Sequence, residues 1–264
     1  NASRAIKSSE KEECAKNGVK DIVEVKIGFD GIVLANSKAA KPLELELKQL
    51  YLALAKNIPD PKSGDKLVPN PYKMWSDIDP SLPKQKIEVL GPPPTSGTRD
   101  AFVELGMEGG CKGFPMLKEM KDKDEKAYKA ACHTVREDGA FIEAGENDNL
   151  IVQKLGANKD AYGIFGYSFL EENLATVKPA IINGSRPTYE SIAGGDYPLS
   201  RPLFFYVKKA HVGVIPGIPE FLAEFTSDKA FGPEGYLADR GLIALPDDQR
   251  KQVTENTKKL ATLK

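Results

Sequence analysis

The feature that most constrains the fold is the alternation of strand-type and helix-type patterns along the whole chain. Strand patterns, with period-two or continuously apolar residues, occur at 19–37, 86–91 and 202–209. Helical patterns separate them, at 8–17, 42–57, 96–107 and 116–135. Because strands that alternate with helices build α/β layers, the sequence predicts an α/β fold with largely parallel sheets.

Individual segments give more specific expectations. The stretch 19–37 predicts two strands separated by a bend at Gly28–Gly31. Residues 42–57 predict one amphipathic helix, and the proline-rich stretch 58–83 predicts a long surface loop with short turns. The segment AYGIFGYSFL at 161–170 predicts a buried strand, and an Asn-Asp-Asn sequence at 147–149 predicts the cap of the helix that follows.

The charge balance limits the classes of partner. The chain has 264 residues, with 37 Lys and Arg against 38 Asp and Glu, so its formal net charge is −1. Nucleic acids and anionic membranes select basic patches, so neither is expected as the main partner. One local site can still bind a small anion whatever the net charge is. No apolar run approaches the roughly 20 residues that a membrane-spanning helix needs.

Three cysteines, Cys14, Cys111 and Cys132, leave two alternatives open. Cys111 and Cys132 flank a charged helical stretch and can close a disulfide loop worth roughly 3 kcal/mol, as in an oxidising compartment such as the periplasm. The alternative is three buried cysteines that pack as small apolar side chains. An odd number leaves at least one thiol without a partner in this chain.

The segment LGPPPTSGTRDAF at 90–102 is the candidate binding motif. A helix that begins at Ser96–Thr98 presents unpaired N–H groups and a partial positive charge, which together favour an oxyanion. The hydroxyl groups of Thr95, Ser96 and Thr98 can donate hydrogen bonds, and Arg99 can add a charge-assisted one. The alternative is an ordinary Ser or Thr cap without a ligand. The pattern of a nucleotide P-loop is absent.

Enzyme signatures are missing from the sequence. His133 and His211 lie far apart, without HExxH, CxxC or G-x-S-x-G motifs near them. The acidic stretch 136–148 could supply paired carboxylates, but a solvated loop accounts for it equally well. No set of base, nucleophile and orienting residue can be assembled, so neither catalysis, nor a metal, nor a cofactor is expected.

Several segments together resemble periplasmic phosphate-binding proteins, the substrate-binding components of phosphate ABC importers. They are NASRAI before an acidic helix, IGFDGIVLANS, MWSDIDPSLPKQKIEVLGPPPTSGTRDAF, AYGIFGYSFL and YPLSRPLFFYVKK, in the family's order. The resemblance covers essentially the whole chain. Its most specific part is the Ser-Gly-Thr helix start, which follows a W-x-D…LP…I-x-V segment.

The resemblance implies a two-lobed, Venus-flytrap fold of the periplasmic binding proteins, with crossovers near 25–29 and 197–202. The first lobe would comprise residues 1–26 and 203–264, and the second lobe residues 27–202. Members of this family open with a strand and a glycine/threonine-rich loop that have no counterpart after Asn1. The first lobe is therefore expected to lack its N-terminal strand.

The resemblance also implies the ligand and its contacts. One dehydrated phosphate would bind through Ser96, Gly97 and Thr98, with Thr95 and Arg99 beside them. Near the chain's start, Ser3 is followed by Arg4, where the family has an Asp whose carboxylate accepts the phosphate proton. Asp138 or Glu143 is the expected replacement. The family's arginine before Ser-Gly-Thr is replaced by Pro92–Pro94, so Arg99 and Arg4 are expected to supply positive charge.

The implied function is that of a monomeric periplasmic protein which captures inorganic phosphate and delivers it to the permease subunits of an ABC transporter. The alternative is a degenerate binding-protein scaffold or interaction protein that has lost high-affinity phosphate binding. A third interpretation, an extracellular phosphatase-like enzyme, requires a metal or nucleophile that the sequence does not provide.

Overall fold

The computed structural model describes residues 2–263, which group into two compact units. Unit 1 comprises Asn1–Gly31, Ile192–Gly195 and Ser200–Lys264, and unit 2 comprises Ile32–Ser191 and Asp196–Leu199. The lobe boundaries predicted from the sequence stay a prediction, and their end residues 1 and 264 lie outside the described part.

Unit 1 is built on a two-stranded ribbon. Its elements are α1 (Ser8–Lys16), the first part of β1 (Ile22–Ser37), β10 (Ser200–Lys208), a 3-10 turn (Lys209–His211), α11 (Ile218–Phe225), α12 (Asp228–Phe231), a second 3-10 turn (Ala238–Arg240) and α13 (Asp247–Lys258). β1 pairs antiparallel with β10, from Ile22 opposite Lys208 to Gly31 opposite Ser200. The side chains of Val23, Val25, Phe205 and Leu222 form its core.

Unit 2 contains most of the regular structure. Its elements are the end of β1, then β2 (Glu44–Leu45), α2 (Leu47–Leu54), β3 (Asn57–Pro59), β4 (Leu67–Pro69), α3 (Trp75–Ile78), β5 (Val89–Gly91), α4 (Gly97–Phe102), a π-helical turn (Val103–Met107), α5 (Glu108–Cys111), α6 (Pro115–Lys123), α7 (Glu125–His133), β6 (Phe141–Glu143), α8 (Asp148–Ala157), β7 (Tyr162–Gly166), α9 (Tyr167–Glu172), β8 (Val177–Pro179) and β9 (Ile181–Ile182). Helix α10 (Tyr189–Gly194) continues from unit 2 into unit 1.

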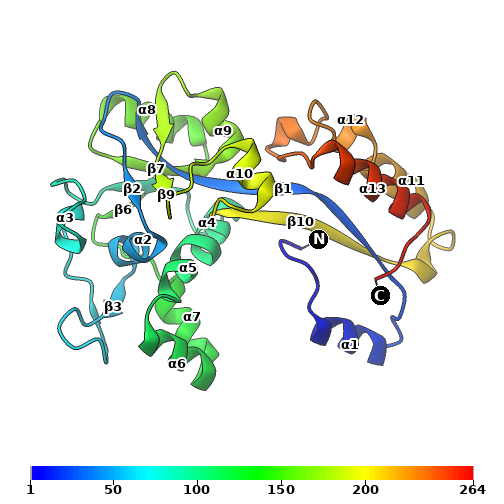
Figure 1. Ribbon diagram of the computed structural model, residues 1–264, viewed down its shortest axis with the longest axis horizontal. Helices are drawn as coiled ribbons and strands as arrows, with labels where there is room; N and C mark the ends of the chain where they lie inside the picture. The colour runs from blue at the N-terminus through cyan, green and yellow to red at the C-terminus, as the bar shows by residue number, and fades with distance from the viewer. Residues whose placement is uncertain (1, 264) are drawn as a thin grey trace. The chain divides into compact units, whose positions relative to one another are not determined.

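The sheet of unit 2 has mixed directions. The end of β1 pairs antiparallel with β7 and β8, whereas β5 pairs parallel with both β7 and β6. Helices α8 and α9 lie above this sheet and α4 and α5 below it in the view of Figure 1. Large side chains that are fully buried, among them Trp75, Tyr51, Phe102 and Phe165, fill the unit. The expectation of largely parallel sheets is therefore wrong, because β1 runs against its three partners.

Three local expectations also differ from the structure. No bend divides 19–37: β1 is one strand of 16 residues, with a bulge between Lys26 and Gly28. The stretch 42–57 holds β2, the shorter helix α2 and the start of β3, and 58–83 contains β4 and α3 besides loops. The buried strand predicted at 161–170 ends at Gly166, where α9 begins.

Candidate functional site

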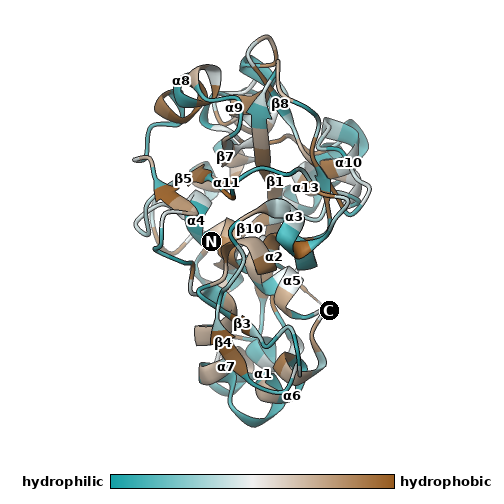
Figure 2. Ribbon diagram, turned by 90° about the vertical axis from the view of Figure 1, so that its left-hand side faces the viewer, coloured by the Kyte–Doolittle hydropathy of each residue, from teal (hydrophilic) through white to brown (hydrophobic). Residues whose placement is uncertain are grey.

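The candidate site begins where β5 ends. β5 is buried, and its two parallel neighbours β6 and β7 end at the same edge of the sheet. Ligands of open α/β sheets bind beyond this carboxyl edge. The chain leaves β5 through Pro92–Pro94 and turns at once, because the Ser96 N–H donates to the Pro93 carbonyl oxygen over 3.0 Å. Hydrophobic β5 gives way here to the hydrophilic start of α4 (Figure 2).

Ser96 caps the helix that follows. Its backbone is extended, and its Oγ accepts a hydrogen bond of 3.2 Å from the Thr98 N–H. The backbone then stays helical from Gly97 to Cys111, through α4, the π-helical turn and α5. The first N–H groups of such a segment have no acceptor within the helix, and the helix dipole concentrates positive potential there.

The start of α4 is open around Gly97 and Thr98. A Cβ added to Gly97 would meet no atom within 4 Å, and the φ of Gly97 is not positive, so neither packing nor backbone strain requires glycine there. Within residues 2–263 the Thr98 hydroxyl has no hydrogen-bond partner, although the Thr98 side chain is partly buried. This end of the helix therefore presents an available backbone and an available hydroxyl.

The Arg99 side chain folds back over the end of the sheet. Its Nη1 donates to the Pro92 carbonyl oxygen at 3.1 Å, and its guanidinium lies 4.3 Å from the centre of the Phe141 ring. Burial lowers the pKa of Arg99, while the charges of Glu143 and Asp100 raise it. An arginine stays protonated under these conditions, so a positive charge is fixed beside the helix start.

Two further predicted residues lie at the same edge. Glu143 ends β6 directly opposite Gly91, the last residue of β5, and is exposed. Thr95 donates from Oγ1 to the Glu146 carboxylate over 2.7 Å, which ties the loop before α4 to the loop after β6. The structure therefore brings Thr95, the segment Ser96–Arg99 and Glu143 together at one edge.

Asp138 is not part of this group. It precedes β6 and lies at the opposite edge of the sheet, where the neighbouring Val89 N–H bonds the Ala140 carbonyl oxygen. Its carboxylate is held by the buried Arg136 and by Lys73, whose Nζ is 2.9 Å away. The hydrogen bonds from Arg136 hold the pKa of Asp138 well below its ordinary value. Within unit 2, Asp138 therefore lies apart from the Ser-Gly-Thr motif, and its role as the acceptor of the phosphate proton stays a prediction.

Ser3 and Arg4 belong to unit 1. The Arg4 guanidinium makes a bidentate ion pair with Glu10, with Nη–Oε distances of 2.8 and 2.6 Å. The hydrogen bond from Arg4 lowers the pKa of Glu10 to about 2. Arg4 thus already neutralises a carboxylate of its own unit. The roles predicted for Ser3 and Arg4 in ligand binding stay predictions.

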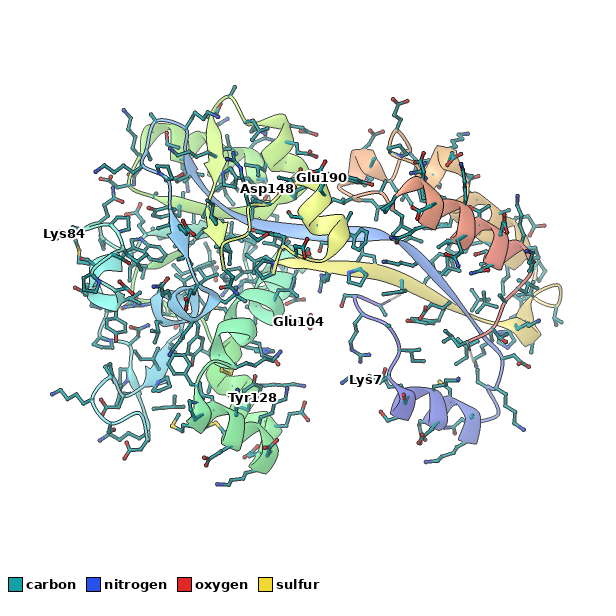
Figure 3. All side chains as sticks on the ribbon, viewed as in Figure 1. Lys7, Lys84, Glu104, Tyr128, Asp148 and Glu190 are labelled. Atoms are coloured by element: carbon teal, nitrogen blue, oxygen red, sulfur yellow. A yellow bond between two sulfur atoms is a disulfide. The ribbon has the colours of Figure 1, made fainter. Side chains whose placement is uncertain are left out.

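Asp148 also lies at the carboxyl edge of the sheet, although the sequence predicted it only as part of a helix cap. It is the first residue of α8 and is labelled in Figure 3. Its carboxyl interacts with the backbone N–H of Gly166, where the strand β7 ends. Burial raises the pKa of Asp148, and the Gly166 N–H partly offsets this. Its burial could not be read from the Asn-Asp-Asn sequence, because a cap residue is usually exposed.

The far end of the helical segment is covalently anchored. A disulfide joins Cys111, the last residue of α5, to Cys132 in α7, with 5.6 Å between their Cα atoms, and Cys14 is a free thiol. Of the two alternatives left by the cysteine count, the structure contains the disulfide. The segment that begins at Gly97 is thereby fixed to α7 at its other end.

Other kinds of site find no support in the described residues. Residues 2–263 contain no group of three or more His, Cys, Asp or Glu side chains that could hold a metal ion. No helix in the same range has the combination of length and apolar character that crossing a membrane requires.

Known proteins share this architecture and sequence. A family model described as a PBP superfamily domain matches residues 1–229. The phosphate-binding protein PstS of Staphylococcus haemolyticus is 30% identical, over 98% of this chain and 69% of its own length. A solved structure, a possible phosphate binding protein from Planctomyces limnophilus, is 25% identical with a TM-score of 0.73, and covers 99% of this chain and 80% of its own.

A second solved structure, an ABC-type phosphate transport receptor from Vibrio cholerae, has a TM-score of 0.59 and 18% identity, over 92% of this chain and 78% of its own. It supports the fold alone. The resemblance inferred from the sequence motifs and the two-lobed α/β fold are confirmed by these similarities. The chain belongs to the PBP superfamily, as a PstS-like member.

Proposed function

We propose that this chain binds inorganic phosphate as the solute-binding component of an ABC importer. The observation that carries the proposal is the helix start at Ser96–Thr98, where an uncrowded glycine and a hydroxyl without a partner follow a buried strand. Backbone N–H groups and hydroxyls can replace the hydration shell of an oxyanion at such a place. Relatives named as phosphate-binding proteins support phosphate as that oxyanion.

The charges at this edge fit a protonated phosphate. Arg99 supplies a positive charge, and its hydrogen bond to the Pro92 carbonyl oxygen holds this charge close to the helix start. Glu143, which ends the neighbouring strand, supplies the carboxylate that accepts the hydrogen of HPO4²⁻. Sulfate has no such hydrogen at neutral pH and would leave two negative groups facing each other, so the pair favours phosphate over sulfate.

The proposal also includes the compartment, the monomeric state and the partner subunits. The protein works outside the cytoplasmic membrane, in the periplasm, as a monomer that hands phosphate to permease subunits. The disulfide between Cys111 and Cys132 supports an oxidising compartment. Ligand-driven closure of two lobes would accompany binding, as it does in other binding proteins of this architecture.

Isothermal titration with Thr98→Val tests the proposed site. The hydroxyl is removed at nearly constant volume, so one hydrogen bond to a charged ligand is lost. Because such bonds are worth about 1.5–3 kcal/mol, phosphate should bind about 10-fold to 100-fold more weakly. Phosphate, arsenate and sulfate are titrated in parallel, and we expect sulfate to bind far more weakly than phosphate.

Thr176→Val is the matched control, since Thr176 is exposed on a loop elsewhere in unit 2 and should leave the affinity unchanged. If both variants bind phosphate like the original chain, the helix start is not the site. If the original folded chain gives no heat with phosphate at all, it is instead a binding-protein scaffold without transport function.

A further inference from the structure

Unit 1 contains a cavity of its own, far along the chain from the Ser-Gly-Thr motif. Its volume is about 670 Å³, and its walls come from α11, α13 and the residues beside them. Apolar side chains of Val212, Pro219, Leu222 and Leu260 contribute much of the lining. A space of this size is within the range of small-molecule sites and far exceeds the share of a single water molecule.

Two polar groups in the cavity wall lack partners. Thr257 is 4% exposed, and its Oγ1 has no hydrogen bond; the buried Nε of Arg250 has none either. The neighbouring threonines differ, because Thr226 donates to the Leu222 carbonyl oxygen over 2.8 Å and Thr254 to that of Thr226 over 2.9 Å. Leaving a buried donor without a partner costs about 1–3 kcal/mol, so these two groups favour a ligand acceptor.

The charge of Arg250 is already balanced. Its Nη2 lies 2.8 Å from Asp247, its Nη1 donates to the Leu245 carbonyl oxygen, and its Nε lies 3.5 Å from the Asp228 carboxylate without the alignment of a hydrogen bond. Both carboxylates belong to the cavity wall. The wall also contains Lys251, Lys258 and Glu255, so its three basic and three acidic side chains balance and leave no net positive charge that would favour an anionic ligand.

We propose that this cavity is a second binding site, for an uncharged organic molecule with an apolar body and one acceptor oxygen, such as an amide or ketone. The apolar walls of α11 and α13 bind the body of the molecule. The Thr257 hydroxyl, which a change of rotamer turns toward the space, donates to the oxygen. This site lies entirely in unit 1 and does not depend on phosphate binding.

Three probes of equal ring size test the chemistry: benzamide, toluene and benzoate. Each is titrated at millimolar concentration into the isotope-labelled protein while the amide signals of α11 and α13 are followed by NMR. We expect benzamide to bind more tightly than toluene, because it adds the acceptor oxygen. Benzoate should bind most weakly, because its carboxylate would lose hydration while Asp228 and Asp247 already neutralise Arg250.

Thr257→Val removes the proposed donor and keeps the shape. It should weaken benzamide binding about threefold to tenfold and leave toluene unchanged, which a merely structural role of Thr257 would not do. Thermal melting of each variant checks that it is folded. Equal losses for benzamide and toluene would overturn the donor assignment.

Ala223→Leu adds bulk to the cavity wall, and Ala210→Leu makes the same change at an exposed position outside it. We expect the first variant to lose benzamide binding and the second to retain it. If no probe shifts the signals of α11 or α13, the cavity holds water only and the proposal is wrong.

Discussion

Two arginines of unit 2 differ in how many of their hydrogen-bond donors are already used. Arg99 ends the segment Ser96–Arg99 and Arg136 begins the acidic stretch 136–148, yet their surroundings differ. Arg136 is buried, and four of its five N–H groups donate to Asp138 and to the carbonyl oxygens of Ala53 and Tyr72. Arg99 makes one hydrogen bond to Pro92, so guanidinium N–H groups remain for a ligand. The number of donors already used separates a structural arginine from a candidate binding arginine.

Glu108 is a titrating carboxylate of unit 2 with a basic partner on each of its two oxygens. Its carboxylate is largely buried, with Oε2 at 2.8 Å from His133 Nε2 and Oε1 at 3.3 Å from Lys112 Nζ. Burial raises its pKa, but the hydrogen bonds and charges of His133 and Lys112 outweigh this, so the pKa is lowered. Burial and the Glu108 charge also raise the pKa of the adjacent Tyr128, on α7, to about 12 (Figure 3).

We predict that Glu108→Gln will flatten the acid-induced loss of stability. Because the pKa of Glu108 is lower in the folded state, the unfolded chain binds the proton more tightly. The contribution of Glu108 to the free energy of unfolding is therefore complete above pH 4.5, the ordinary pKa of this carboxyl. It is lost as the pH falls through the lower folded-state value. Melting temperatures between pH 7 and pH 3 should fall less steeply in the variant, which should also melt lower at pH 7.

Glu119→Gln is the control for this prediction, because the ion pair of Glu119 with Lys123 is exposed on both sides. Its melting curve should follow that of the original chain at every pH. An unchanged acid slope in Glu108→Gln would contradict the assigned role.

Helices α5 and α7 depend on each other through the disulfide. Cys111 and Cys132 are fully buried and 21 positions apart in the chain. Closing a loop of this length restricts the unfolded chain, and such restrictions are worth about 3 kcal/mol. We therefore predict that dithiothreitol, or the double change Cys111→Ala and Cys132→Ala, will lower the free energy of unfolding in urea by about 3 kcal/mol.

The free thiol provides the comparison. Cys14→Ala alone should leave the unfolding midpoint unchanged, in both oxidising and reducing buffer. A midpoint of the original chain that does not respond to reductant would count against a stabilising disulfide.

The elements that the sequence predicted well are those whose signals are local. The cap at Ser96, the helix predicted at 8–17 and the buried apolar residues of β7 depend on short patterns, and the structure has them. The direction of β1 relative to its partners could not be predicted, because pairing with β7 and β10 depends on residues more than 100 positions away. The same holds for the bulge at Gly28, where an added Cβ would collide with the Ile243 carbonyl oxygen.

The candidate site likewise contains residues that a local sequence pattern identifies and residues whose place depends on distant segments. The motif itself, Ser96–Arg99, was identifiable from the sequence because helix caps and anion sites share a short signature. Asp138 and Glu143 lie five positions apart, but β6 separates them and places them at opposite edges of the sheet. The burial of Asp148 depends on the end of β7, which no local pattern indicates.

At the scale of the whole molecule, one unit is inserted in the other. Unit 2 is almost continuous, whereas unit 1 is assembled from chain on both sides of it. The ends of the insertion meet, because the Ile32 N–H donates to the Leu199 carbonyl oxygen over 2.8 Å. Once unit 2 is folded, the loop that separates β1 from β10 has effectively been closed, and the entropy cost of pairing them falls.

We predict that unit 2 folds before unit 1 during refolding from urea. Trp75, the one tryptophan of the chain, is fully buried in unit 2, so its fluorescence reports on that unit. Its signal should recover before the amides of Ile22–Gly31 and of β10 become protected in pulsed hydrogen exchange. Simultaneous recovery of both signals would show that the two units fold as one.

The same insertion sets an order on protein synthesis. Ile22 leaves the ribosome 186 positions before its partner Lys208, a delay of about 10–40 seconds at ordinary translation rates. During that time the apolar residues Val23 and Val25 have no partner strand in unit 1. A nascent β1 is thus exposed to other growing chains, and a chaperone that shields it until β10 emerges would raise the yield of folded protein.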